Sequence, residues 1–145
     1  VSILNYHGIE INDFAVVVAR TALCIAEHKM NLETEKVVRR NLKFLPLKRD
    51  LNIVEGNSLE IPWEDVVCKE RLSYIIGNPP FVGNSKLNVE QKKERSKLFK
   101  KDAGKLDYVC CWFKKATNFI EGTYIKCAFV STNSICQGEQ ACPLC

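Results

Sequence analysis

The sequence predicts an α/β fold in which helices cover a parallel β-sheet. Short apolar segments that favour strands alternate along the chain with segments of helical periodicity. The strand segments are apolar at nearly every position, which is typical of parallel strands buried on both faces. Ligands bind at the carboxyl ends of the strands in such sheets, so polar residues directly after each predicted strand are the candidates for a functional site.

The composition is that of a globular protein. Of its 145 residues, 46% are hydrophobic and 26% are charged, and the formal net charge is +4. This length suits one domain or part of a larger one. No apolar run is long enough for a transmembrane helix, and no secretion signal is visible. We therefore expect a cytoplasmic protein with no membrane partner, and the absence of an initial methionine suggests that residues 1–145 are part of a longer chain.

Eight cysteines are many for this length, but they do not predict a disulfide framework or a metal site. Several lie within apolar segments, where a free cysteine behaves as a small hydrophobic residue. These are Cys24, Cys110, Cys111 and Cys127. Cys142 and Cys145 form a C-x-x-C pair with only Cys136 nearby, which is fewer than the four ligands of a structural zinc site. We expect reduced thiols and no metal.

The first half of the chain predicts a strand, a helix and a second strand. Residues 6–11 form the first strand, and Asn12 or Asp13 then caps the helix. The helix ends near Asn31, and the second strand covers residues 51–54. Apolar residues at helical spacing define one face of the helix, namely Phe14, Val17, Val18, Thr21, Ala22 and Ile25.

The second half predicts a third strand, a polar loop, a helix and a fourth strand. The third strand covers residues 71–76, and the polar stretch 84–105 is expected to form a loop. The helix covers residues 106–121 and ends at Gly122, and the last strand covers residues 124–130. The apolar side of this helix comprises Val109, Trp112, Phe113, Ala116, Phe119 and Ile120.

Polar groups follow all four predicted strands and are expected to converge on one rim. They are Glu10, Asn57 with Ser58, Asn78, and residues 131–133. Glu10 could accept two hydrogen bonds from a ribose diol, or it could favour the dipole of the following helix. Asn57 could pair with the edge of a base, although the local sequence favours an ordinary turn residue.

The third strand ends in the segment GNPPF, residues 77–81. Pro79 and Pro80 cannot continue a central strand, because proline has no backbone N–H. They leave carbonyl groups in a stiff, extended geometry, so the Asn78 side-chain oxygen and a peptide carbonyl form two fixed acceptors. Such a pair suits an exocyclic amino group whose lone pair is delocalised into a ring. Phe81 offers a flat apolar surface on which that ring could stack.

These segments resemble those of a known enzyme family. GNPPF resembles the (N/D/S)PP(Y/F) motif of the N6-adenine DNA methyltransferases, which use S-adenosyl-L-methionine. GIEIND resembles their ribose-binding segment, and GNSL resembles the segment that contacts the cofactor adenine. GKLDYVCCWFKKA and AFVSTNSICQGEQ are similar to later segments of single-chain restriction–modification proteins, the MmeI-like family in particular. The resemblance covers nearly the whole chain in the same order, and implies a Rossmann-like fold.

The resemblance also implies roles for individual residues. Glu10 and its neighbour Ile11 would hold the cofactor ribose, and Asn57 with Ser58 would contact its adenine. Asn78 and the Pro79 carbonyl would bind the target amino group. The catalytic motif is completed by Pro80 and by Phe81, which would stack on the target base. The partner would be double-stranded DNA with a flipped adenine, and no metal is implied.

Residues 84–105 hold eight Lys or Arg residues against three Asp or Glu residues. Such a segment is a candidate for phosphate neutralisation, although a charge run is more often a solvated surface. The candidate residues for phosphate contacts are Lys86, Lys92, Lys93, Arg95, Lys97, Lys100 and Lys101.

Two departures from the family pattern suggest a partial catalytic domain. The glycine-rich first motif and its strand are absent from residues 1–145 and are expected upstream, and the sequence CPLC does not match the pattern expected near the end. We therefore expect residues 1–145 to be inactive alone. Two alternatives remain open: a methyltransferase that acts on an RNA base or a protein glutamine, and a non-catalytic module that binds nucleic acid through residues 84–105.

Overall fold

The computed structural model describes residues 2–39, 51–100, 104 and 106–136. The chain consists of two compact units, Val1–Val67 and Cys68–Cys145. Each unit contains a two-stranded sheet whose strands are parallel, together with α-helices. The predicted α/β class and the parallel strand pairing are therefore confirmed within each unit.

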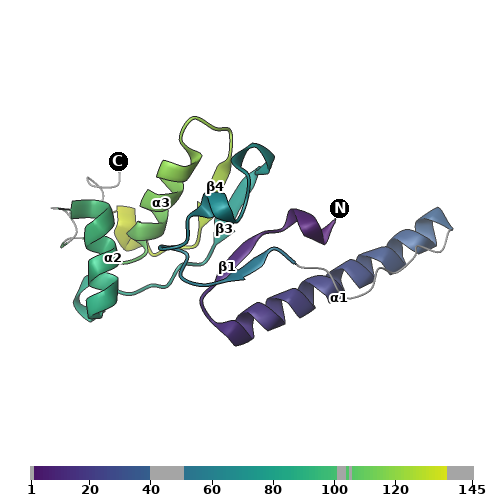
Figure 1. Ribbon diagram of the computed structural model, residues 1–145, viewed down its shortest axis with the longest axis horizontal. Coiled ribbons are helices and arrows are strands. Elements are labelled where there is room, and N and C mark those ends of the chain that lie inside the picture. Colours follow the sequence, from purple (N-terminus) through teal and green to yellow (C-terminus); the bar gives the residue numbers. More distant parts are fainter. Residues whose placement is uncertain (1, 40–50, 101–103, 105, 137–145) are drawn as a thin grey trace. The chain divides into compact units, whose positions relative to one another are not determined.

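The first unit is built from β1 (Gly8–Glu10), α1 (Asp13–Val38) and β2 (Ile53–Glu55). Glu10 lies opposite Glu55 in the register of β1 and β2. Figure 1 shows α1 running alongside this pair of strands and continuing beyond it. Asn12 caps α1 as predicted, because its Oδ1 accepts a hydrogen bond of 2.9 Å from the Ala15 backbone N–H.

Helix α1 is longer than predicted. It extends to Val38, whereas the sequence suggested an end near Asn31. The intervening residues contain neither Gly nor Pro, and Lys36 pairs with Glu33 at 2.6 Å on the exposed surface. Helix formation therefore continues as far as Arg39, which ends the helix in the left-handed conformation with φ 52°.

The apolar face predicted for α1 is largely exposed within the described residues. The side chains of Phe14 and Val17 are 73% and 59% exposed, whereas Val16 is buried. Periodicity therefore located the helix correctly, but it did not identify Val16 as the buried residue of this helix.

The second unit is built from β3 (Tyr74–Gly77), α2 (Val89–Phe99), α3 (Cys110–Ile120) and β4 (Lys126–Phe129). Gly77 lies opposite Phe129 in the parallel register of β3 and β4. Helix α3 contacts both α2 and β4 (Figure 1). Gly122 follows the helix with φ 73°, as expected for a glycine that ends a helix. The predicted helix start at residue 106 was early, because α3 begins at Cys110.

The prediction of a loop over residues 84–105 was wrong, because α2 occupies half of that stretch. The helix begins with a capping box. Asn88 Oδ1 accepts a hydrogen bond of 2.8 Å from the Gln91 backbone N–H, and Gln91 Oε1 accepts one of 3.1 Å from the Asn88 N–H. The sequence analysis overlooked this signal, because Asn followed three residues later by Gln is typical of a helix start.

The core of the second unit lies around the start of α3. Leu106, Val109, Cys110 and Cys111 are almost completely buried. Burial raises the pKa of the Cys110 thiol to about 11 and that of the Cys111 thiol to about 12. Both cysteines are free thiols, which confirms the expectation that they serve as small hydrophobic residues.

We expect Cys110 and Cys111 to resist alkylation by iodoacetamide at about pH 8, because the thiolate is the reactive form. Cys68 is free and exposed, and provides the comparison. Because burial raises the pKa of the Cys110 thiol and so favours its protonated form in the folded state, the stabilisation from Cys110 is complete below the ordinary thiol pKa of 9.0 and is lost as the pH rises through about 11. Peptide mass spectrometry measures the modification, and equal rates at Cys68 and Cys110 in the folded protein would contradict this prediction.

Candidate functional site

The first unit places two predicted site residues, Glu10 and Asn57, at the carboxyl ends of β1 and β2. The Gly56 backbone N–H donates a hydrogen bond of 2.8 Å to the Glu10 carbonyl, so Asn57 follows directly beside the end of β1. Gly56 has φ 148°, and a Cβ atom there would lie 2.5 Å from the Ile61 Cδ1 atom. Only glycine therefore fits this turn without a rearrangement.

The Glu10 carboxylate is half-buried and has a local role. Its Oε1 atom accepts a hydrogen bond of 3.0 Å from the Asn12 backbone N–H, at the start of α1. The Oε2 atom makes no hydrogen bond to any residue that the structure describes. One carboxylate oxygen is thus engaged at the helix start. The neighbouring Ile11 side chain is 70% exposed.

Asn57 and Ser58 form a turn after β2. Asn57 Oδ1 accepts a hydrogen bond of 2.9 Å from the Leu59 backbone N–H, which confirms the role of a turn residue. The Ser58 carbonyl accepts a hydrogen bond of 2.9 Å from the indole Nε1–H of the buried Trp63.

The second unit brings Asn78 and Ser131 to the carboxyl ends of β3 and β4. The Val130 backbone N–H donates a hydrogen bond of 3.0 Å to the Gly77 carbonyl, so the chain leaves the two strands at the same level. A Cβ atom at Gly77 would lie only 3.2 Å from the ring of Phe129, which shows that Gly77 and the Phe129 side chain approach closely here.

The motif residues carry acceptors that are not engaged within the described part of the chain. The exposed Asn78 amide makes no hydrogen bond there, and neither does the carbonyl of the buried Pro79. Pro80 is exposed, and the Phe81 side chain is 48% exposed. Consecutive residues of the motif thus carry two acceptors, and Phe81 carries an aromatic ring that is accessible at the surface.

A polar network connects the segment after the motif to the residues before α3. The Val82 carbonyl accepts a hydrogen bond of 3.1 Å from the Tyr108 backbone N–H. The Asn84 backbone N–H donates to Asp107 Oδ1 at 3.3 Å, and the Ser134 hydroxyl donates to Asp107 Oδ2 at 3.1 Å. Asp107 therefore links the segments that follow β3 and β4. Sequence reasoning missed this network, although Asp107 stands in the segment GKLDY.

The structure contradicts the assignment of Arg95 as a phosphate contact. Its side chain is only 5% exposed. The guanidinium NH1 group donates hydrogen bonds of 2.6 Å to Asn84 Oδ1 and of 2.6 Å to the Leu106 carbonyl. Arg95 thus uses its charged group inside the protein. It belongs to the network described above.

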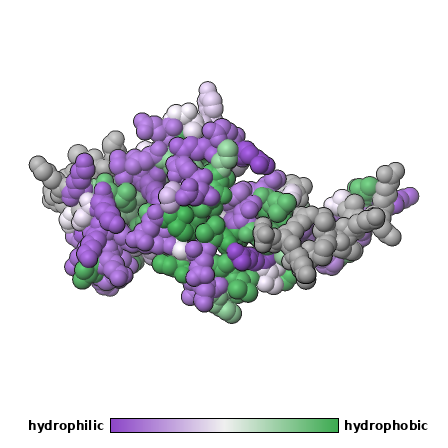
Figure 2. Space-filling model, viewed as in Figure 1, coloured by the Kyte–Doolittle hydropathy of each residue, from purple (hydrophilic) through white to green (hydrophobic). Residues whose placement is uncertain are grey.

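The other basic candidates lie on the surface, with one outside the described residues. Figure 2 shows a mainly hydrophilic surface over α2. The exposed members of the predicted set are Lys86, Lys92, Lys93, Lys97 and Lys100. Lys101 lies outside the described residues.

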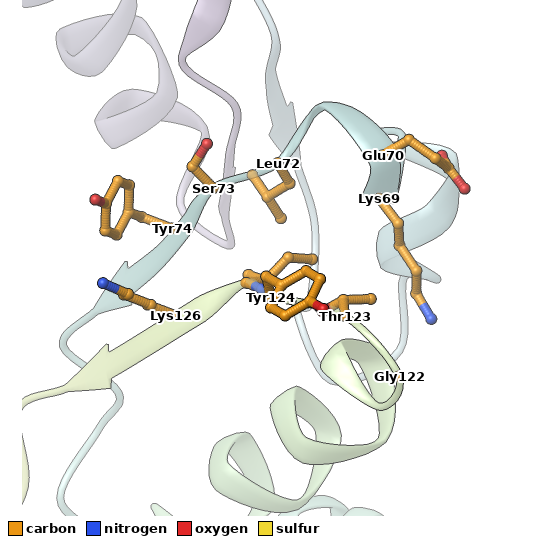
Figure 3. A pocket seen from close by; sticks show the side chains of 10 residues that line it. Lys69, Glu70, Leu72, Ser73, Tyr74, Gly122, Thr123, Tyr124 and Lys126 are labelled. Atoms are coloured by element: carbon orange, nitrogen blue, oxygen red, sulfur yellow. Dashed lines mark hydrogen bonds between the residues drawn. The ribbon is translucent and has the colours of Figure 1, made fainter.

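A pocket of about 490 Å³ lies at the amino ends of β3 and β4, whereas Asn78 follows the carboxyl end of β3. Its lining includes Tyr74 at the start of β3 and Lys126 at the start of β4 (Figure 3). Ligands of parallel α/β sheets bind at the carboxyl ends, whereas this pocket lies at the amino ends. We therefore place the candidate site at the carboxyl ends, away from the pocket.

The described residues contain no cluster of His, Cys, Asp or Glu side chains that could hold a metal ion. Cys142 and Cys145 lie outside the described residues. Among the described helices, none is both long and apolar enough to cross a membrane.

Comparison with known proteins gives three consistent matches. Residues 1–145 match the family model of the MmeI DNA-methyltransferase domain. The chain is 40% identical over 146 aligned positions to DNA methyltransferase A of Bacillus subtilis (strain 168), with 97% of this chain and 16% of that protein covered. It also matches a solved structure of the Type IIL restriction-modification enzyme MmeI in complex with DNA, with a TM-score of 0.91 and 39% identity. That match covers 99% of this chain and 20% of the MmeI chain.

Proposed function

The chain belongs to the MmeI family of DNA-methyltransferase domains, and from this premise we propose that it takes part in methyl transfer from S-adenosyl-L-methionine to the N6 amino group of adenine in DNA. The chain spans about a sixth to a fifth of the length of the relatives that it matches. The observation that carries the proposal is the pair of unengaged acceptors, Asn78 Oδ1 and the Pro79 carbonyl, beside the exposed Phe81.

The two acceptors activate a poor nucleophile. The lone pair of an exocyclic amino group is delocalised into the base, so the nitrogen attacks slowly. Asn78 Oδ1 and the Pro79 carbonyl would each accept a hydrogen bond from one N–H of the amino group, which raises the electron density on nitrogen and favours tetrahedral geometry. When bound, the cofactor would supply an activated methyl group on its sulfonium. An N–C bond would then replace the C–S bond, and the displaced amino proton would pass to solvent.

Phe81 favours the extrahelical position of the target base. Flipping a base out of the duplex costs a few kcal/mol. Stacking of a base on an aromatic side chain contributes about 1–3 kcal/mol, and the half-exposed Phe81 ring is accessible for it. The exposed lysines along residues 86–100 would neutralise DNA phosphates.

The first unit would hold the cofactor. Glu10 Oε2 is open to a ribose hydroxyl, while its partner Oε1 is fixed by the Asn12 N–H at 3.0 Å, which orients the carboxylate. Ile11 is exposed beside it and offers an apolar surface. The turn of Asn57 and Ser58 would contact the adenine of the cofactor.

The test is to incubate the full-length protein with methyl-labelled S-adenosyl-L-methionine and, separately, unmethylated DNA, tRNA and a release factor. We expect the label in DNA, and mass spectrometry of the digested DNA should identify N6-methyladenine. Label in tRNA or in a protein glutamine alone would overturn the DNA proposal. DNA binding with no methylation of any substrate would support a non-catalytic module.

We also propose that residues 1–145 alone are inactive. Within the described residues, β1 pairs only with β2 and β3 only with β4, so each sheet has edges with unpaired backbone groups. Such edges favour aggregation. In the same assay, methylation by the isolated 145-residue chain above background would contradict this expectation.

A further inference from the structure

Among the described residues, hydrogen bonds hold the NPPF motif only at its two ends. On one side, the Gly77 carbonyl accepts a hydrogen bond of 3.0 Å from the Val130 N–H. On the other side, the Val82 carbonyl accepts one of 3.1 Å from the Tyr108 N–H. Residues 78–81 make no hydrogen bond within the described part of the chain. The positions of the two acceptors therefore depend on these end anchors and on the stiffness of the prolines.

The downstream anchor is reinforced by a buried charge. Arg95 reaches from α2 and donates both to Asn84 Oδ1 and to the Leu106 carbonyl, at 2.6 Å each. It thus ties the loop after the motif to the residues before α3. The Asn84 N–H bond to Asp107 Oδ1, at 3.3 Å, joins the same two segments a second time.

Burial strengthens the hydrogen bonds of Arg95 and makes their loss costly. The Arg95 side chain is 5% exposed, so its hydrogen bonds do not compete with bulk water. Loss of the guanidinium would leave two oxygen atoms without their donor and would open a gap between α2 and the loop. A displacement of the acceptors by about 1 Å is enough to slow a reaction about 10²-fold.

We propose that Arg95 is a positioning residue, which acts through Asn84 to hold Asn78 and the Pro79 carbonyl in the geometry required for methyl transfer. This inference rests on the proposed function. It replaces the role of a phosphate contact, which the composition of residues 84–105 suggested.

The test compares Arg95→Gln with Lys93→Gln in the full-length protein. Both substitutions remove one positive charge from α2, but Lys93 is exposed. We expect Arg95→Gln to lower the single-turnover rate at saturating DNA and cofactor by about 10–100-fold. The dissociation constants for DNA and for S-adenosyl-L-methionine should stay within about twofold, with the salt dependence of DNA binding unchanged. Lys93→Gln should instead reduce the slope of log K against log salt by about 0.9.

A second pair of variants keeps the test decisive if Arg95→Gln fails to fold. Asn84 is exposed, so its substitution disturbs the core less. Asn84→Asp retains the oxygen that accepts from Arg95, and Asn84→Ala does not. At saturating DNA, we expect Asn84→Asp to transfer methyl groups at least about fivefold faster than Asn84→Ala. If Arg95→Gln does fold, its effect and that of Asn84→Ala should be non-additive in the double variant. Lys29→Gln, an exposed charge removal on α1, should leave the rate within about twofold.

Each outcome separates this inference from the function on which it rests. Weaker DNA binding and a smaller salt slope in Arg95→Gln, with a normal transfer rate, would restore the phosphate contact and overturn the inference. Equal rates for Asn84→Asp and Asn84→Ala would also overturn it. A normal rate in Asn78→Ala would refute the proposed function itself, whereas a slow Asn78→Ala with a normal Arg95→Gln would refute only the positioning role.

Discussion

Replacement of Asn78 by alanine in the full-length protein is expected to slow methyl transfer by about 10²–10³-fold, the loss typical when one preorganised hydrogen bond to a transition state is removed. The Asn78 amide is exposed and unengaged within the described residues, so its removal breaks no internal hydrogen bond. The effect should therefore fall on the chemical step. Affinity for S-adenosyl-L-methionine should change by less than about threefold.

Single-turnover methylation and equilibrium cofactor binding together measure this prediction. Asn118→Ala is the matched control, because Asn118 is an exposed asparagine on α3 whose side chain makes no hydrogen bond to other described residues. Its rate should stay within about twofold of the unmodified protein. If Asn78→Ala also keeps a near-normal rate, Asn78 does not bind the target amino group.

Local sequence signals predicted the parts of the fold that depend on local physics. The cap at Asn12 and the helix stop at Gly122 follow from hydrogen bonding and backbone conformation within a few residues. The parallel pairing of both sheets followed from apolar strands that alternate with helices. Helix α2 was missed because its composition is polar, although its capping box is present in the sequence.

Tertiary environment was beyond the reach of these signals. A charge count treats Arg95 and Lys93 alike. The structure shows that Arg95 is buried and donates hydrogen bonds to Asn84 and Leu106. Periodicity likewise gives the face of α1 that is apolar and not the residue that is covered. The strand-end rule proposed Asn78 and Glu10 as site candidates, because each follows or ends a strand of its own parallel sheet. The bonds that engage or orient the candidates, such as those of Asp107, required the structure.

The side chains of Glu10 and Asn57 show why a site needs more than position. Both lie at the predicted edge of the β1–β2 sheet, and both have a local hydrogen bond that a structural role would explain. For Asn57 that bond engages the side-chain oxygen itself. For Glu10 one oxygen remains, so the ribose role can be separated from the helix-start role by experiment.

Glu10→Ala is expected to weaken cofactor binding at least about tenfold, because a hydrogen bond to a charged group contributes about 1.5–3 kcal/mol. DNA affinity should be nearly unchanged. The control is Glu55→Ala, since Glu55 lies opposite Glu10 in the strand register and is exposed. Glu10→Gln keeps an acceptor for the Asn12 N–H and loses the charge. Its affinity for the cofactor should therefore fall between that of the unmodified protein and that of Glu10→Ala.

A cofactor analogue with a 2′-deoxyribose separates the two roles of Glu10. If its carboxylate binds the ribose diol, the unmodified protein should prefer the natural cofactor over the analogue by about tenfold, and Glu10→Ala should show almost no preference. If Glu10 acts only at the start of α1, through its 3.0 Å bond to the Asn12 N–H, both proteins should discriminate equally. Isothermal titration of both proteins with both cofactors decides between them, because a difference in preference requires that the carboxylate and the missing hydroxyl interact.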